Sequence, residues 1–214
     1  MIKNLPFDQH VATYEEWFKH YPWVYQSELA AIKKLWPKGD HLLSLEIGAA
    51  TGRFAKDLGI TEGLEPAKNM AAVADARGVK TWCGIAESLP YKSMQFDIVL
   101  MNFCISYLEK PAESISEAFR VLKDNGCLII GFIDKDSGIG HAYEKRKPYS
   151  LFYRNANFYS VSDVVKMIVD AGFEDLIFQQ TLFAPIDSVT SIEDSIPGYG
   201  KGSYVFIKAI KKNS

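Results

Sequence analysis

Short apolar runs alternate with amphipathic stretches through the middle of the chain. Nearly continuous apolar runs predict strands at residues 42–47, 63–64, 81–83, 96–102 and 127–133. Parallel strands that are buried on both faces have this pattern. Helical patterns lie between the runs, at residues 52–58, 67–77 and 111–122, and a turn at residues 124–126 closes the last helix. This alternation predicts an α/β fold with a doubly wound, mostly parallel sheet.

The two ends of the chain add further elements. Residues 1–40 predict an N-terminal helical cover, in which Pro22 breaks a first aromatic run and Ser27-Glu28 opens a second amphipathic stretch. Residues 134–160 are polar and aromatic without clear periodicity, and we expect a lid-like substrate segment there. Ser160 precedes Asp163 by three positions, which predicts a capping box and a helix. Residues 176–183 and 203–210 predict an antiparallel pair of strands at the sheet edge.

Length and composition limit the classes of function. The 214 residues suit one core better than two, so we interpret residues 1–214 as a single domain. The balance of 24 Lys and Arg against 26 Asp and Glu disfavours a nucleic-acid partner. The apolar runs are far shorter than the roughly 20 residues that cross a bilayer, so we expect a cytoplasmic protein without a membrane partner. Three cysteines without ligand spacing suggest no metal, and the sequence does not indicate an oligomeric state.

The turn after the first predicted strand is the most informative segment. Glu46 precedes a run of small residues, namely Gly48, Ala49, Ala50 and Gly52. Small side chains let a ligand approach the backbone, and the start of the following helix offers unpaired N–H groups. A dinucleotide-binding turn would carry glycines at positions 48, 50 and 53, where this chain has Gly48, Ala50 and Arg53. Glu46 would repel a pyrophosphate but suits a cationic group.

Two later segments complete a binding pattern. Glu65 lies 19 residues after Glu46, at the end of the short second strand. An acid in this position can accept both hydroxyls of a ribose. Residues 84–90 follow the third strand and are placed to form a wall beside an adenine. Together these segments indicate a nucleoside with a positively charged tail.

The ordered motifs resemble a known family. They are Glu46-x-Gly48-x-x-x-Gly52, Glu65-Pro66, Ala86-Glu87-x-Leu89-Pro90, Phe96-Asp97-Ile98-Val99 and Val121-Leu122-Lys123-x-x-Gly126. Over roughly residues 10–175 this order is similar to the class I S-adenosylmethionine-dependent methyltransferases, within the small-molecule branch that includes ubiquinone/menaquinone-biosynthesis-type enzymes. The resemblance implies a Rossmann-like fold of seven strands, the last antiparallel. It also implies in-line methyl transfer to a small-molecule acceptor, with S-adenosylhomocysteine as product and no metal.

The resemblance further implies which residues bind the cofactor. They are Tyr14, Glu46, Gly48, Ala49, Gly52, Arg53, Glu65, Pro66, Met70, Ala86, Glu87, Asn102 and Phe103. Glu46 would lie near the amino group of the methionine part, Glu65 would hold the ribose hydroxyls, and Tyr14 would cap the carboxylate. The adenine would lie between Pro66 and the segment of Ala86 and Glu87. The family commonly has an acid at position 85, whereas Ile85 cannot accept a hydrogen bond from the adenine amino group.

No catalytic residue follows from the motifs. Contacts to the acceptor are expected from aromatic and titratable side chains of the cover and the lid-like segment, namely Tyr14, His141, Tyr149 and Tyr153. A base is needed only if the acceptor carries a proton that must leave. Two alternatives stay open, a catalytically inactive S-adenosylmethionine-binding interaction module and a nicotinamide-dependent oxidoreductase.

Overall fold

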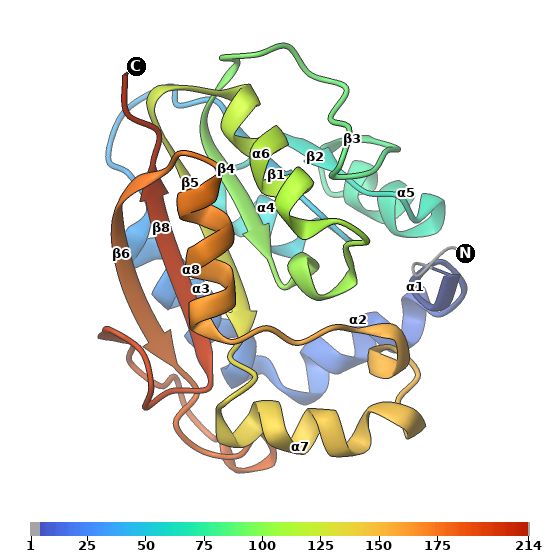
Figure 1. Cartoon of the computed structure of the whole chain (residues 1–214). Coiled ribbons are helices and arrows are strands. Elements are labelled where there is room, and N and C mark those ends of the chain that lie inside the picture. Colours follow the sequence, from blue (N-terminus) through green and yellow to red (C-terminus); the bar gives the residue numbers. More distant parts are fainter. Residues whose placement is uncertain (1–4, 214) are drawn as a thin grey trace.

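Within residues 5–213, which the computed structural model describes, eight strands form one sheet (Figure 1). The strand order is β3-β2-β1-β4-β5-β8-β6-β7. The strands are β1 (Ser44–Ile47), β2 (Glu62–Leu64), β3 (Lys80–Trp82), β4 (Phe96–Asn102), β5 (Leu122–Ile133), β6 (Glu174–Thr181), β7 (Ile196–Pro197) and β8 (Tyr204–Ile210). The first five strands pair in parallel, and β8 runs antiparallel to both β5 and β6. This confirms the predicted doubly wound, mostly parallel sheet, to which β7 adds a two-residue edge strand.

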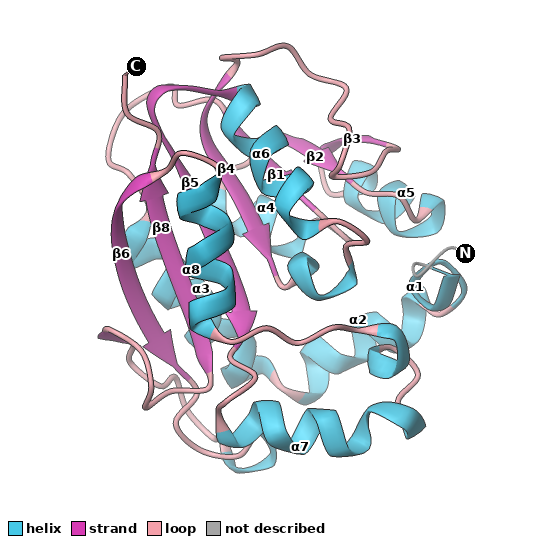
Figure 2. Ribbon diagram, viewed as in Figure 1, coloured by secondary structure: helices cyan, strands magenta, loops and turns pink. Residues whose placement is uncertain are grey.

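Helices cover both faces of the sheet (Figure 2). They are α1 (Leu5–Gln9), α2 (Val11–His20), α3 (Pro22–Leu35), α4 (Arg53–Leu58), α5 (Lys68–Ala76), α6 (Pro111–Val121), α7 (Gly138–Arg146) and α8 (Val161–Asp170). In β4, Ile98 and Leu100 join the apolar cluster of α3, α4 and α5, whereas Val99 and Met101 join that of α6 and α8. The apolar run of β4 is continuous because both of its faces are buried.

Three details differ from the sequence prediction. Helix α3 begins at Pro22, because proline fits the first helical position, and Ser27 lies buried within the helix and does not start it. Strand β5 begins at Leu122, and the expected turn at residues 124–126 is part of an irregularity inside this strand. The lid-like segment contains α7, whose N-cap Ser137 accepts a 3.0 Å hydrogen bond from the N–H of Gly140.

The elements that matter for the site meet at the carboxyl ends of the parallel strands. Figure 1 shows α2 and α7 crossing the molecule beyond the arrowheads of β4 and β5. Helix α8 approaches the same region and has the predicted capping box between Ser160 and Asp163. Over residues 5–213, none of the helices combines the length and the apolar character needed to span a membrane. The covered strand ends are where ligands bind in open α/β sheets.

Candidate functional site

The turn after β1 packs closely against the end of β2. The N–H groups of Gly48 and Ala49 donate to the carbonyl oxygen of Leu64 at 2.8 and 3.0 Å. Gly48 has a φ of +73°, and a Cβ atom there would lie 2.5 Å from Cβ of Cys104. Only glycine satisfies both conditions, because other residues strain at this φ and would collide with Cys104. Gly48 is therefore required for close packing against Cys104, and together with Ala50 it also lines both cavities described below.

Glu65 fixes this turn from the neighbouring strand. Its two carboxylate oxygens accept hydrogen bonds from the N–H groups of Ala50 and Ala67, both at 2.8 Å. Burial raises the pKa of Glu65 to about 7, although these two hydrogen bonds oppose the shift. Each oxygen keeps a further lone pair. Glu65 can therefore hold the turn and still accept hydrogen bonds from ligand hydroxyls.

Glu46, in β1, has an unsatisfied carboxylate oxygen. The side chain is 2% exposed, and Oε2 has no hydrogen-bond partner among residues 5–213. Burial raises the pKa of Glu46 to about 8, against a lowering hydrogen bond from the backbone of Ala55. A buried carboxylate without a full set of partners is costly, so this oxygen favours a cationic or hydrogen-donating ligand.

A trough with a volume of about 790 Å³ extends from this turn along the strand ends. Its walls include Glu65, Pro66, Met70, Ile85 and Ala86. The volume lies in the range of small-molecule and cofactor sites, roughly 300–1,000 Å³. Glu87 also lines the trough, but its Oε1 accepts the N–H groups of Glu109 and Lys110 at 3.0 and 3.1 Å. Its carboxylate is therefore partly committed to the protein backbone.

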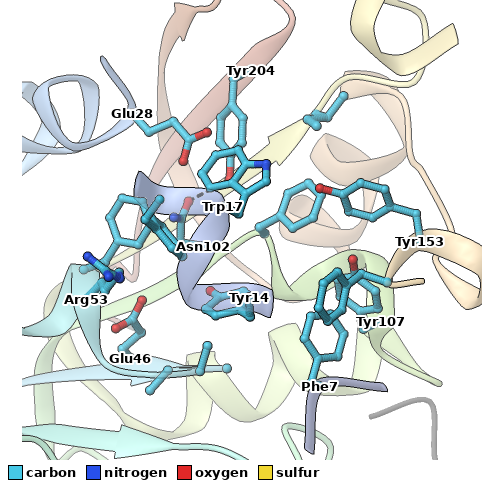
Figure 3. A pocket seen from close by; sticks show the side chains of 18 of the residues that line it. Phe7, Tyr14, Trp17, Glu28, Glu46, Arg53, Asn102, Tyr107, Tyr153 and Tyr204 are labelled. Atoms are coloured by element: carbon cyan, nitrogen blue, oxygen red, sulfur yellow. Dashed lines mark hydrogen bonds between the residues drawn. The ribbon is translucent and has the colours of Figure 1, made fainter. Parts of the chain in front are cut away.

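A second cavity, with a volume of about 110 Å³, lies beneath the N-terminal helices, and we call it the aromatic chamber (Figure 3). Its aromatic lining comprises Phe7, Tyr14, Trp17, Phe18, Phe54, Phe103, Tyr107, Tyr143, Phe152, Tyr153 and Tyr204. Tyr143 and Tyr153 stack with ring centroids 4.7 Å apart. The hydroxyl of Tyr204 donates to Oδ1 of Asn102 at 2.9 Å, which fixes this ring at the end of β4. The chamber is thus a small, largely apolar space.

The trough and the aromatic chamber share a wall. The residues that line both cavities are Phe7, Tyr14, Gly48, Ala50, Asn102, Phe103 and Tyr107. Asn102 ends β4, and Phe103 follows with a φ of +60°. A ligand in the trough and a second ligand in the chamber would therefore meet at the end of β4.

Glu28 is the second acid that lines the chamber. It lies in α3 and is 7% exposed. Burial alone raises its pKa to about 8. Figure 3 shows its carboxylate directed into the chamber, on the side of Tyr204.

The N-terminal cover is fastened by an ion cluster. Glu15 of α2 accepts hydrogen bonds from Thr51, Arg53 and Arg77. Burial raises the pKa of Glu15, but these three partners outweigh it and hold the pKa at about 2. Helix α2, which carries Tyr14 and Trp17 into the chamber, is thereby fixed to α4 and to the end of α5.

Comparison with known proteins identifies the family. Residues 45–130 match the family described as a methyltransferase domain. A crystal structure from Thermotoga maritima, described as an S-adenosylmethionine-dependent methyltransferase and possible histamine N-methyltransferase, is 42% identical with a TM-score of 0.94, covering 98% of this chain and 100% of that one. The chain belongs to the S-adenosylmethionine-dependent methyltransferases.

Two further relatives are similar to this methyltransferase over about two thirds or more of their own length. An uncharacterized protein from Methanocaldococcus jannaschii is 42% identical over 205 residues, 96% of this chain and 98% of the relative. The ubiquinone/menaquinone biosynthesis C-methyltransferase of Roseobacter denitrificans is 27% identical over 168 residues, which are 63% of this chain and 67% of the relative. These matches confirm the resemblance inferred from the ordered motifs, and they favour a transferase over the oxidoreductase alternative.

The methyltransferase structure brings most of the expected cofactor-binding residues together. All of them except Gly52 line the trough, the chamber or both. Gly52 caps α4 at a φ of +73°, and a Cβ there would approach Ala74 and Val79 within 3.1 Å. Gly52 therefore serves close packing behind the turn. Arg53 lines the chamber but is also paired with Glu15.

The acceptor-side candidates divide into two groups. Tyr14 and Tyr153 line the chamber, whereas His141 is exposed on α7 and Tyr149 is 90% exposed, and neither lines either cavity. Sequence reasoning missed Glu28, Trp17 and Tyr204 as chamber residues. The signal that could have revealed Glu28 is an acid on the apolar face of a helix, beside Leu29 and Ile32.

Proposed function

We propose that this protein transfers a methyl group from S-adenosylmethionine in the trough to a small molecule in the aromatic chamber. The wall that the two cavities share at the end of β4 is the observation that carries the proposal. It would let the two reactants meet at Asn102 and Phe103 while aromatic side chains exclude water. The names of the relatives, a C-methyltransferase and a possible N-methyltransferase, are in keeping with a small-molecule acceptor.

The residues present fit the cofactor. The unpartnered Oε2 of Glu46 suits the ammonium group of the methionine part, which would extend from the trough past the shared wall to the part of the chamber that Glu46 lines. Glu65 has lone pairs for the ribose hydroxyls, and Gly48 and Ala50 of the turn line the trough. Pro66, Met70 and Ala86 would contact the adenine. Because Ile85 cannot accept a hydrogen bond and Glu87 is partly engaged, backbone groups of residues 84–87 would recognise the adenine amino group.

The chemistry asks the protein mainly for alignment. When bound, S-adenosylmethionine supplies a methyl carbon to the lone pair of an acceptor atom in line with the breaking carbon–sulfur bond, whose electron pair stays on the sulfur. The chain has to position the acceptor, and such positioning can supply about 7 kcal/mol of the barrier or more. Asn102, held by the hydroxyl of Tyr204, and the rings of Tyr14 and Phe103 would set that position.

Thermal unfolding in the presence of added ligand tests this function. S-adenosylmethionine and S-adenosylhomocysteine should bind, and either one at about 100 times its Kd should stabilise the protein by about 2.7 kcal/mol. NAD should leave the unfolding temperature unchanged. Stabilisation by NAD, or by none of the three compounds, would contradict the proposal. Cofactor binding without methyl transfer to any compound of a broad acceptor panel would support the inactive-module alternative.

A further inference from the structure

Glu28 is a buried acid without an ion-pair or hydrogen-bond partner in the described chain, and burial favours its protonated form until a cation approaches. Among residues 5–213, its carboxyl group takes part in no hydrogen bond or ion pair, and burial is the one influence on its pKa. The side chain is 7% exposed, and what remains exposed faces the aromatic chamber. Burial of an unpaired carboxylate costs free energy unless a partner compensates for it. The partner that this position lacks must enter through the chamber.

The charges around the chamber restrict the chemistry of that partner. Glu28 and Glu46 are the acids of its lining, and Arg53 is its one cationic side chain within residues 5–213. The guanidinium of Arg53 donates to Glu15 through Nε and Nη2 at 3.2 and 2.5 Å. Glu15 also pairs with Arg77, so its one negative charge only partly offsets that of Arg53. With both acids ionised, the lining carries one negative charge in excess of Arg53, so a cation that enters the chamber is attracted and in turn favours ionisation of the acids.

Aromatic rings complete the environment of a cation site. The rings of Tyr143, Tyr153 and Tyr204 line the chamber together with Trp17. Burial raises the pKa values of these three tyrosines, and the charge of Glu28 raises each of them further, so their hydroxyl groups lie within its electrostatic reach. Electron-rich ring faces attract ammonium groups, and the attraction grows when water is excluded.

The size of the chamber limits its occupant. The volume is about 110 Å³. A cavity of about 150 Å³ holds one benzene molecule when measured in a comparable way. The chamber is smaller than this, so its occupant is a short chain with one charged end, or one small ring that extends toward the trough past the shared wall. That end would lie at Glu28, and the other end would reach the wall shared with the trough.

We propose that the methyl acceptor is a small molecule with one ammonium group, and that Glu28 selects it as the counter-ion of that group. The inference rests on the proposed methyl-transfer function and adds the acceptor class to it. Glu46 then pairs with the ammonium group of the cofactor, and Glu28 pairs with that of the acceptor. Neutral and anionic molecules of the same shape bind less tightly because they form no ion pair with Glu28.

Three ring compounds of one shape test this inference by calorimetry. Benzylamine, protonated at neutral pH, should bind the protein saturated with S-adenosylhomocysteine at least about tenfold more tightly than neutral benzyl alcohol, and benzoate should not bind. Nearly equal binding of benzylamine and benzyl alcohol, preference for benzoate, or binding of none of the three would overturn the inference. This comparison needs only the wild-type protein, so it decides the question even if a variant fails to fold.

Two variants attribute the preference to Glu28. In Glu28→Gln the preference for benzylamine should fall to within about twofold, while the affinity for S-adenosylhomocysteine stays within about twofold of wild type. Glu16→Gln removes the same charge from the exposed face of α2 and should keep the preference. A preference that survives in Glu28→Gln would overturn the inference. Failure of S-adenosylhomocysteine to bind would instead reject the proposed function, and the three compounds would still be compared on the cofactor-free protein.

Discussion

Glu15 of α2 and Arg77, which follows α5, are joined by two hydrogen bonds although 62 positions separate them. Arg53 donates to the same carboxylate. These hydrogen bonds fasten α2 to the rest of the fold. Because α2 carries Tyr14 and Trp17, they also hold one wall of the aromatic chamber in place. The stability of this wall is the first property that a mutation can test.

Glu15→Gln should lower the free energy of unfolding by about 2 kcal/mol at pH 7, after allowance for solvent screening. The pKa of Glu15 is about 2 in the folded protein against 4.5 ordinarily. Its contribution is therefore complete above pH 4.5 and is lost as the pH falls toward 2. Urea denaturation at several pH values measures both effects. Glu16→Gln, which breaks only an exposed pair with Lys19, should change stability by less than about 0.5 kcal/mol; an equal loss in both variants would show that the cluster does not fasten α2.

Glu65→Gln should weaken binding of S-adenosylhomocysteine at least about tenfold, because hydrogen bonds to a charged acceptor contribute roughly 1.5–3 kcal/mol. The matched control is Glu62→Gln, three positions earlier, whose carboxylate contacts Lys80 and Trp82 at the surface. The control should bind within about twofold of wild type. Calorimetric Kd values decide the matter, and equal effects at the two positions would remove the ribose assignment.

Gly48→Ala should destabilise the protein more than Gly59→Ala. Both glycines have a φ of +73°, so each substitution pays about 1–2 kcal/mol of backbone strain. Only at position 48 would the new Cβ also lie 2.5 Å from Cβ of Cys104, whereas nothing lies within 4 Å at position 59. We expect an excess loss of about 1–3 kcal/mol at position 48, measured by chemical denaturation. Equal losses would mean that the segment after β4 moves away freely.

Glu28→Gln should stabilise the ligand-free protein in a pH-dependent way. Burial places the pKa of Glu28 at about 8, above the ordinary 4.5. Below pH 4.5 the carboxyl is protonated in both folded and unfolded protein, and the substitution should change little. Between these two values unfolding releases a proton, so the stability of the wild type declines as the pH rises. At pH 8 the variant should therefore be more stable by about 2–4 kcal/mol. An equal gain in stability at pH 4 and pH 8 would show that folding does not raise the pKa of Glu28.

The central sheet was predictable because its signals are local. The apolar run of β4 predicts the observed bounds, and Ser160 and Asp163 form the predicted capping box. Acids at the carboxyl ends of neighbouring parallel strands converge, and Glu46 and Glu65 accordingly lie within electrostatic reach of each other. These inferences need only strand periodicity and the rule for ligand sites in open sheets.

The chamber was not predictable because its walls depend on distant contacts. Ser27 resembles a helix start, yet its hydroxyl donates to the carbonyl of Trp23 and accepts the N–H of Glu193, 166 positions away. Helix α7 was missed because its polar and aromatic side chains follow no apolar stripe. His141 and Tyr149 carry chemically suitable side chains. Because the sequence pattern did not predict the helices of this segment, it could not show that these two side chains face solvent.

The chamber draws Glu28, Trp17, Tyr143 and Tyr204 from outside residues 45–130, the stretch that matches the methyltransferase domain. Under the proposed function, the donor would therefore be held mainly by the matched stretch, whereas much of the wall around the acceptor would come from the flanking segments. Natural selection can reshape the outer segments toward a new metabolite while the inherited nucleoside cradle stays untouched. Descendants of one ancestor could in this way diversify their targets without reinventing the reaction.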